Sequence, residues 1–355
     1  MSPHSLSKSL SNLTLNPTDS PTNPSPSPST SSSSSSPSRY SDMWNYLWIP
    51  VLIALSKELT SAKAQSTILL PSEVGLEPPR LPSCPLPDPK LNFRPVIGIL
   101  THPGDGASGR LNNDTNASYI AASYVKFVES AGARVIPLIY NEPPEILYNK
   151  LNLVNGVLFT GGWAKSGLYF EVVERIFKDN NILETFSAAD QASTLQFVKN
   201  INIEGTVFQR FPPDLLKKLS TDCLVMQNHH YGISPGRFKE NEDLCSFFNI
   251  LTTSADEDNE VYVSTVQAHS YPVTAFQWHP EKNAFEWGLK MIPHSEDAIQ
   301  VTQQVANFFV SEARKSLNRP PARKVLDNLI YNYSPTYCGK AGKGYDEVYI
   351  FSLNL

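Results

Sequence analysis

The sequence has little of what nucleic-acid-binding proteins, zinc proteins and membrane proteins need. Its 29 Lys and Arg are outnumbered by 34 Asp and Glu, and the net charge of −5 argues against a dense basic face for nucleic acid. No Cys-x-x-Cys pair or Cys/His cluster is present, which argues against a structural zinc site. No apolar run approaches the roughly 20 residues that span a bilayer. We find no internal repeats.

Cysteine is scarce, with four in 355 residues. In an oxidising compartment they can pair in three ways, and the sequence does not choose among them. The four are Cys84, Cys223, Cys245 and Cys338.

The N-terminal region divides into three segments by composition. Residues 1–42 contain 17 Ser and 7 Pro. They have almost nothing apolar to bury, so we expect disorder. Residues 43–64 resemble a secretory signal, with a short apolar run and a small-x-small cleavage site at Ala62–Ala64. This leaves the true start open between Met1 and Met43. A short amphipathic helix and an organellar transit peptide are the alternatives. Residues 65–91 form a Pro-rich leader.

Residues 92–355 read as the folded domain. Apolar runs separated by turn residues predict strands, and apolar residues at helical spacing predict helices over 117–131 and 297–316. Strands and helices alternate from Pro95 to Gly162, which is typical of an α/β domain with a parallel sheet and helices on its faces. The later part is richer in strands. The predicted strands are 96–100, 133–139, 154–160, 247–253, 261–266 and 273–278.

The motif Gln-Trp-His-Pro-Glu follows the last predicted strand directly and is the first candidate site. His279 and Glu281 are two residues apart, so their side chains can lie on one side of the chain. The carboxylate can hold the Nδ1 proton and leave Nε2 free as a base and an acid. A surface turn with incidental charges is the alternative interpretation.

Two further candidates come from other strand ends. Gly161 and Gly162 follow a predicted strand, and their unhindered backbone amides can bind a developing oxyanion. By themselves they are equally typical of a strand-to-helix turn. His229 and His230 are adjacent, so at most one of them faces a site, and a surface loop accounts for the pair as well.

Long stretches of the sequence resemble the γ-glutamyl hydrolase family, and a plant member in particular. The resemblance covers about residues 92–355 and implies a class-I glutamine amidotransferase-like α/β fold. It also implies cysteine-type (omega peptidase) hydrolysis of folyl or antifolyl poly-γ-glutamates, without a cofactor or metal. The stretches are PVIGILTHPG, NASYIAASYVKFVESAGARVIPLIY, NGVLFTGGWAKSGLY and QWHPEKNAFEW.

The resemblance assigns roles to the candidate residues. His279 corresponds to the catalytic His, with Glu281 as its orienting partner. His229 corresponds to a further important His, and Gly161 and Gly162 correspond to the loop beside the oxyanion site. The resemblance also implies the vacuole or the cell exterior as location, and it leaves a homodimer open.

One element of the family is missing. The family places its nucleophile in a Gly-x-Cys-x-Gly turn between a strand and a helix. We expect this turn between Lys178 and Asn181, and no such pattern occurs anywhere in the chain. None of the four cysteines has a matching context: Cys84 lies in the leader, Cys223 lacks glycine neighbours, Cys245 is in an acidic segment and Cys338 lies in the terminal tail. The sheet is therefore expected to lack one central strand and the following helix.

The sequence predicts a family member that is inactive as written, because no acyl-enzyme forms without an attacking thiolate. A splicing or gene-model error and a true pseudoenzyme both explain the gap. The alternatives are a non-catalytic binder of folate polyglutamates, a partner subunit of an intact homologue, and an active enzyme that uses Cys223.

Overall fold

The computed structural model describes residue 84 and residues 86–104, 117–161, 182–339 and 345–352. Pro85–Leu355 form a compact unit. The three N-terminal segments expected from composition fall almost entirely outside the described residues. Among the helices that the structure describes, none has the length and apolar character for crossing a bilayer.

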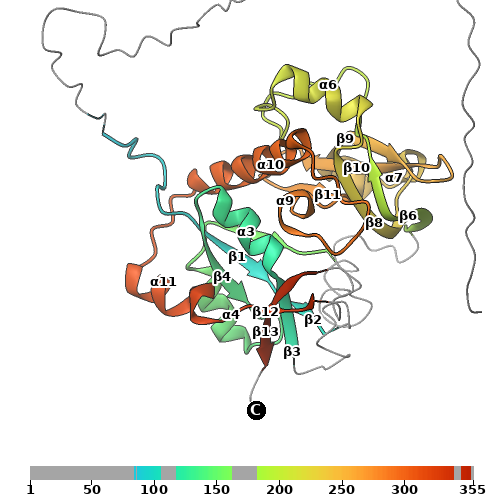
Figure 1. Ribbon diagram of the computed structural model, residues 1–355. Coiled ribbons are helices and arrows are strands. Elements are labelled where there is room, and N and C mark those ends of the chain that lie inside the picture. The colour runs from blue at the N-terminus through green and yellow to red at the C-terminus, as the bar shows by residue number, and fades with distance from the viewer. Residues whose placement is uncertain (1–83, 85, 105–116, 162–181, 340–344, 353–355) are drawn as a thin grey trace, which may run out of the picture. The chain divides into compact units, whose positions relative to one another are not determined.

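A three-stranded parallel sheet forms the centre of one part of the unit (Figure 1). Its order is β4-β1-β5, with β1 at Val96–Leu100, β4 at Arg134–Leu138 and β5 at Gly156–Phe159. Ile97 is paired with Val135 on one side and with Gly156 on the other. The predicted α/β class and its parallel sheet are confirmed, and all three strands lie within predicted ranges.

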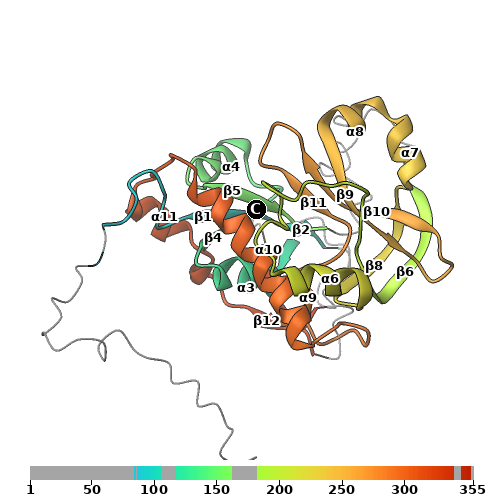
Figure 2. The same ribbon diagram turned by 90° about the horizontal axis from the view of Figure 1, so that it is seen from above.

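Helices cover both faces of this sheet, because alternate residues of its strands point to opposite sides. Ile97, Ile99 and Val135 pack on the face of α3 (Ala122–Ser130) and α10 (Glu296–Arg314). Figure 2 shows α10 beside α3. Val96, Ile136 and Leu138 pack on the other face, where α4 (Pro144–Leu151) and α11 (Ala322–Asn328) lie.

The second part of the unit is antiparallel. Strand β6 (Glu184–Ser193) pairs with β8 (Val225–Gly232), and a four-stranded sheet has the order β11-β10-β9-β7. Its strands are Gln196–Phe197 (β7), Phe248–Ala255 (β9), Val261–Ala268 (β10) and Thr274–Phe276 (β11). The predicted strands in this region are confirmed, while β6 and β8 were not predicted. Short helices connect the strands: α6 (Pro213–Thr221), α7 (Pro235–Glu240) and α8 (Glu242–Phe247). A further short helix, α9 (Lys282–Phe285), lies between β11 and α10.

The predicted helix over 117–131 is wrong in its first turn and a half. Residues Ala117–Ala121 form strand β3, and the helix begins at Ala122. β3 pairs with β13 (Glu347–Ser352) and with β2 (His102–Pro103), and β12 (Thr336–Tyr337) completes this sheet. Pairing with a strand near the far end of the chain overrides the local helical pattern. Cys338, in the terminal tail, directly follows β12 and is buried. A 3-10 turn at Ile330–Asn332 precedes β12.

Candidate active site

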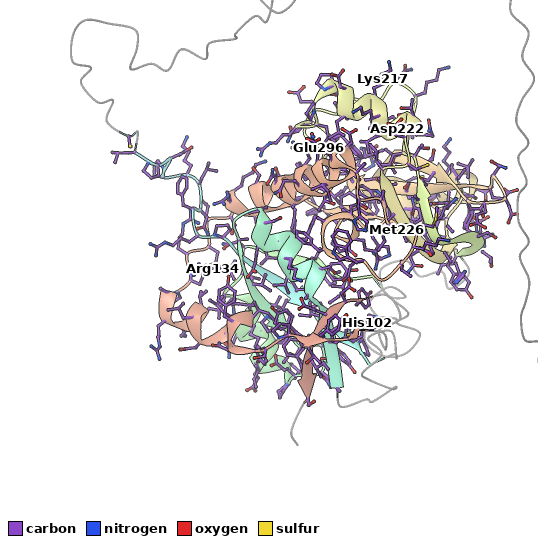
Figure 3. The ribbon with its side chains drawn as sticks, in the orientation of Figure 1. His102, Arg134, Lys217, Asp222, Met226 and Glu296 are labelled. Atoms are coloured by element: carbon purple, nitrogen blue, oxygen red, sulfur yellow. The ribbon has the colours of Figure 1, made fainter. Side chains whose placement is uncertain are left out.

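The segment that carries His279 is fixed between the two antiparallel sheets. The backbone N–H of His279 donates to the carbonyl of Met226, 2.8 Å away, near the start of β8. Met226 is labelled in Figure 3. Trp278 is buried, and its indole Nε1 donates to Thr265 Oγ1 on β10 at 2.9 Å. These contacts hold the loop after β11 in one place, so the backbone that carries the His279 imidazole is fixed.

The predicted pair of His279 and Glu281 exists. Nδ1 of His279 and Oε1 of Glu281 are 2.9 Å apart, and the imidazole is 18% exposed while the carboxylate is 2% exposed. A carboxylate only accepts, so Nδ1 carries the proton and Nε2 is left free for chemistry. The side chains converge because Glu281 has a helical backbone conformation at the start of α9, and strand alternation is not the cause.

A second layer of polar groups surrounds the Glu281 carboxylate, and sequence analysis missed it. Tyr124, from α3, is buried close to Glu281. Burial, together with the negative charge of Glu281, raises the pKa of Tyr124 well above its ordinary value. Lys282 is also buried, and its Nζ lies 4.7 Å from the centre of the Tyr345 ring. Tyr124 occupies an apolar helical pattern far upstream, so no local signal indicates its role.

Opposing effects set the pKa of Glu281. Burial raises it, but the positive charge and the hydrogen bond of His279 outweigh burial, with help from Lys282, and hold the pKa below its ordinary value. The carboxylate therefore stays ionised and can stabilise an imidazolium at His279. This arrangement suits proton transfer at Nε2.

His229 lies close enough to His279 for their charges to interact. Burial, followed by the charge of His279, lowers the pKa of His229 to about 4. Its ring meets the Tyr262 ring edge-on, with the centroids 4.7 Å apart. Nδ1 of His229 lies 3.1 Å from the carbonyl oxygen of Tyr231. The structure thus places His279 beside Glu281, with His229 near enough for its charge to interact with that of His279, and the role of His229 stays a prediction.

The glycine loop is only partly described. Gly161 is exposed two residues after the end of β5, and a side chain there would meet nothing within 4 Å among the residues that the structure describes. Gly162 lies outside the described residues, as does the junction between Lys178 and Asn181. The predicted oxyanion role of both glycines stays a prediction.

The four cysteines lie in different environments, which range from exposed to buried. All four fall within the described residues, where no disulfide joins any of them. Cys245 Sγ faces the backbone carbonyls of Phe238 and Lys239, Cys338 is buried beside Tyr119 and Val348, and Cys84 and Cys223 are exposed. Among the described residues, no three His, Cys, Asp or Glu side chains are grouped to hold a metal ion.

Comparisons with known proteins identify relatives. Residues 95–171 match the family model Peptidase C26. The chain is 61% identical to gamma-glutamyl hydrolase 2 of Arabidopsis thaliana, covering 87% of this chain and 98% of that protein. It is 63% identical to gamma-glutamyl hydrolase 1 of Arabidopsis thaliana (82% and 92% covered) and 54% identical to gamma-glutamyl hydrolase of Glycine max (82% and 94%). Among solved structures, a putative GMP synthase subunit from Thermoplasma acidophilum has a TM-score of 0.32 at 12% identity, covering 61% of this chain and 95% of that one.

The alignments also contain residues of the relatives that have no counterpart here. The first runs over 341 residues, whereas 87% of this 355-residue chain is about 309 residues. The remaining positions of that alignment therefore hold residues of the relative with no counterpart in this chain.

Proposed function

The chain belongs to the γ-glutamyl hydrolase family, and we propose that it binds poly-γ-glutamate chains of folates at a hydrolase site that lacks its nucleophile. The observation that carries this proposal is the buried pair of His279 and Glu281, 2.9 Å apart, in a chain without a Gly-x-Cys-x-Gly turn. The proton-transfer groups are retained while the attacking group is not.

In an intact site, a thiolate attacks the γ-amide carbonyl and the C–N bond then breaks. The protonated Nε2 of His279 gives its proton to the departing nitrogen, and Glu281 stabilises the imidazolium before that transfer. The resulting thioester is hydrolysed by water, with His279 as the base. Without the thiol, the first bond does not form, and the remaining groups bind the ligand.

Two observations support a missing segment next to the glycine loop. β5 has no further strand beyond it among the described residues, and Phe159 at its end is 62% exposed. A strand inside a parallel sheet is normally buried on both sides. The extra residues of the first Arabidopsis relative agree with a deletion in this chain. Both observations are consistent with a gap at Lys178–Asn181.

The test is equilibrium binding by calorimetry, with pteroyl tri-γ-glutamate as ligand and chromatography of the recovered ligand. We expect saturable binding with the ligand recovered uncut. His279→Ala should weaken binding, whereas Glu257→Ala, an exposed position on a turn, should not. Absence of binding would contradict the proposed ligand, and recovery of shortened ligand would contradict the missing nucleophile.

The proposed working compartment is the vacuole or the cell exterior, supported by the signal-like residues 43–64. Sequencing of the mature N-terminus from plant cells tests this, with cleavage after Ala64 expected. A retained Met1 would contradict it.

A further inference from the structure

Thr302 lies within helix α10, and its hydroxyl donates to a residue outside that helix. Oγ1 of Thr302 is 2.7 Å from the carbonyl oxygen of Pro280, and both residues are buried. A threonine hydroxyl has one hydrogen to donate, and inside a helix it commonly gives that hydrogen to a carbonyl one turn back. Threonine is also a weak helix former. Its presence here therefore points to a role in the contact with Pro280.

Pro280 separates the two residues of the His279–Glu281 pair, and its carbonyl belongs to the peptide unit that joins it to Glu281. Because a peptide unit is planar, a hydrogen bond that orients this carbonyl also orients the N–H of Glu281. The Glu281 backbone has φ −75° and ψ −24°, and its side chain reaches His279 from this helical conformation. The Thr302 hydroxyl thus acts on the backbone that aims the carboxylate.

The two members of the pair are held by different elements. The backbone of His279 is attached to β8 by the hydrogen bond described above. The residues that follow are attached to α10 at two points, since Thr302 donates to Pro280 and Nδ2 of Asn283 donates to the carbonyl of Ala298 at 3.1 Å. Ala298 and Thr302 are four residues apart, so they lie on the same face of the helix. One face of α10 therefore fixes the carboxylate side of the pair, while β8 fixes the imidazole side.

We propose that Thr302 is a positioning residue for the pair of His279 and Glu281. Its hydroxyl holds the Pro280–Glu281 peptide so that the carboxylate reaches Nδ1 of His279, which keeps the hydrogen on Nδ1 and leaves Nε2 available. Thr302 acts through Glu281 and does not touch the reacting atoms. The inference deepens the proposed function and rests on it for the role of the pair in proton transfer.

The test compares substitutions at two buried threonines. Thr302→Val keeps the shape of the side chain without its hydroxyl, and Thr302→Ser keeps the hydroxyl without the methyl group. The matched control is Thr206→Val, because Oγ1 of the buried Thr206, between β7 and α6, also donates to a backbone carbonyl, that of Ile203, at 2.6 Å. Both valine variants leave a buried carbonyl without this donor, so we expect both to lose stability in urea unfolding.

The readout that distinguishes them is the position of the hydrogen on the His279 imidazole. It is measured from the ¹⁵N NMR signals of the two ring nitrogens in the ligand-free full chain at pH 8. We expect the wild type, Thr302→Ser and Thr206→Val to carry the hydrogen on Nδ1. In Thr302→Val the ratio of the Nδ1–H form to the Nε2–H form should fall about fivefold, which corresponds to one ordinary hydrogen bond.

A merely structural role for Thr302 would lower stability without moving this ratio. An unchanged ratio in Thr302→Val, an equal fall in Thr206→Val, or a hydrogen on Nε2 in the wild type would overturn the inference. If Thr302→Val does not fold, Thr302→Ala removes the same hydroxyl and should show the same fall.

A second comparison tests whether Thr302 acts through the carboxylate. In a Glu281→Gln background, adding Thr302→Val should leave the ratio unchanged, and a further fall would contradict the inference. Because neither measurement needs a ligand, both are separate from the binding test. Absence of binding to pteroyl tri-γ-glutamate would contradict the proposed function alone.

Discussion

Glu281 is a buried charge on which three other polar side chains depend. It accepts from Nδ1 of His279, and the buried Tyr124 and Lys282 lie near it. We predict that Glu281→Ala lowers the free energy of unfolding by about 3–5 kcal/mol, because it removes the buried carboxylate that pairs with His279 and lies beside Lys282. Urea unfolding at pH 7 measures this.

The matched control for that variant is Glu257→Ala, which removes an exposed carboxylate from a turn and should change stability by less than about 0.5 kcal/mol. Equal losses in the two variants would show that the Glu281 cluster contributes nothing specific to stability.

The low pKa of His229 makes stability depend on pH in a defined window. The unfolded chain binds a proton at His229 near pH 6.5, while the folded chain binds it at about pH 4. Its contribution to stability is present above pH 6.5 and is lost as pH falls through 4. Relative to His229→Gln, we predict that the wild type loses about 2–3 kcal/mol between pH 7 and pH 4.

Unfolding by urea at several pH values in that range checks the prediction. If the unfolding free energies of the wild type and of His229→Gln change in parallel with pH, His229 titrates normally in the folded protein.

At this scale, the sequence predicted the pair of His279 and Glu281 but not what surrounds it. The spacing in Gln-Trp-His-Pro-Glu pointed to His279 and Glu281, although the helical backbone of Glu281 and not strand alternation brings their side chains together. Tyr124 could not be predicted, because its contact with Glu281 depends on how α3 packs against the start of α9.

Among the elements, α9 connects the site to its surroundings through Asn283. This side chain is fully buried, and its Nδ2 donates to the carbonyl of Leu224 before β8 and to that of Ala298 in α10. We predict that Asn283→Ala destabilises the protein by about 2–4 kcal/mol, because two buried carbonyls lose their donor. Thermal or urea unfolding measures this loss. Gln300→Ala, on the exposed side of α10, is the control and should have almost no effect.

Glu286, just after α9, joins this element to the C-terminal strand. Its Oε2 accepts from the backbone N–H of Asp346 at 2.8 Å, and burial raises its pKa to about 7. Since the folded state holds the proton more tightly than the unfolded state, its favourable contribution is full below about pH 4.5 and is lost as pH rises through 7.

We predict that the wild type loses about 3 kcal/mol of stability relative to Glu286→Gln between pH 4.5 and pH 8. Comparison with this variant cancels the opposite effect of His229 in the same range. A difference in unfolding free energy between the wild type and Glu286→Gln that stays constant across that pH range would contradict the raised pKa of Glu286.

Local sequence patterns predicted elements whose partners lie nearby and failed where distant pairing decides. Strands β1, β4 and β5 are apolar runs of the central sheet, so their signal is strong. Residues 117–121 have a helical pattern, yet they form β3 because β13, at the far end of the chain, pairs with them. Strand β6 is mixed in polarity, and only its pairing with β8 defines it.

At the scale of the whole molecule, the proposed function combines a retained His–Glu pair with an absent nucleophile. His279 and Glu281 form a pair, whereas the four cysteines lie in other environments and β5 ends at an exposed phenylalanine. His229 lies on β8, and His279 and Glu281 follow β11, so all three belong to the antiparallel part of the fold.

The most direct measurement is turnover of a pteroyl oligo-γ-glutamate by the purified full chain, followed by mass spectrometry of the products and of the protein, with and without prior iodoacetamide. We predict no release of glutamate or of its oligomers above the uncatalysed rate, and no thioester on any cysteine. Release that iodoacetamide abolishes, or a trapped acyl group on Cys84, Cys223, Cys245 or Cys338, would contradict the account.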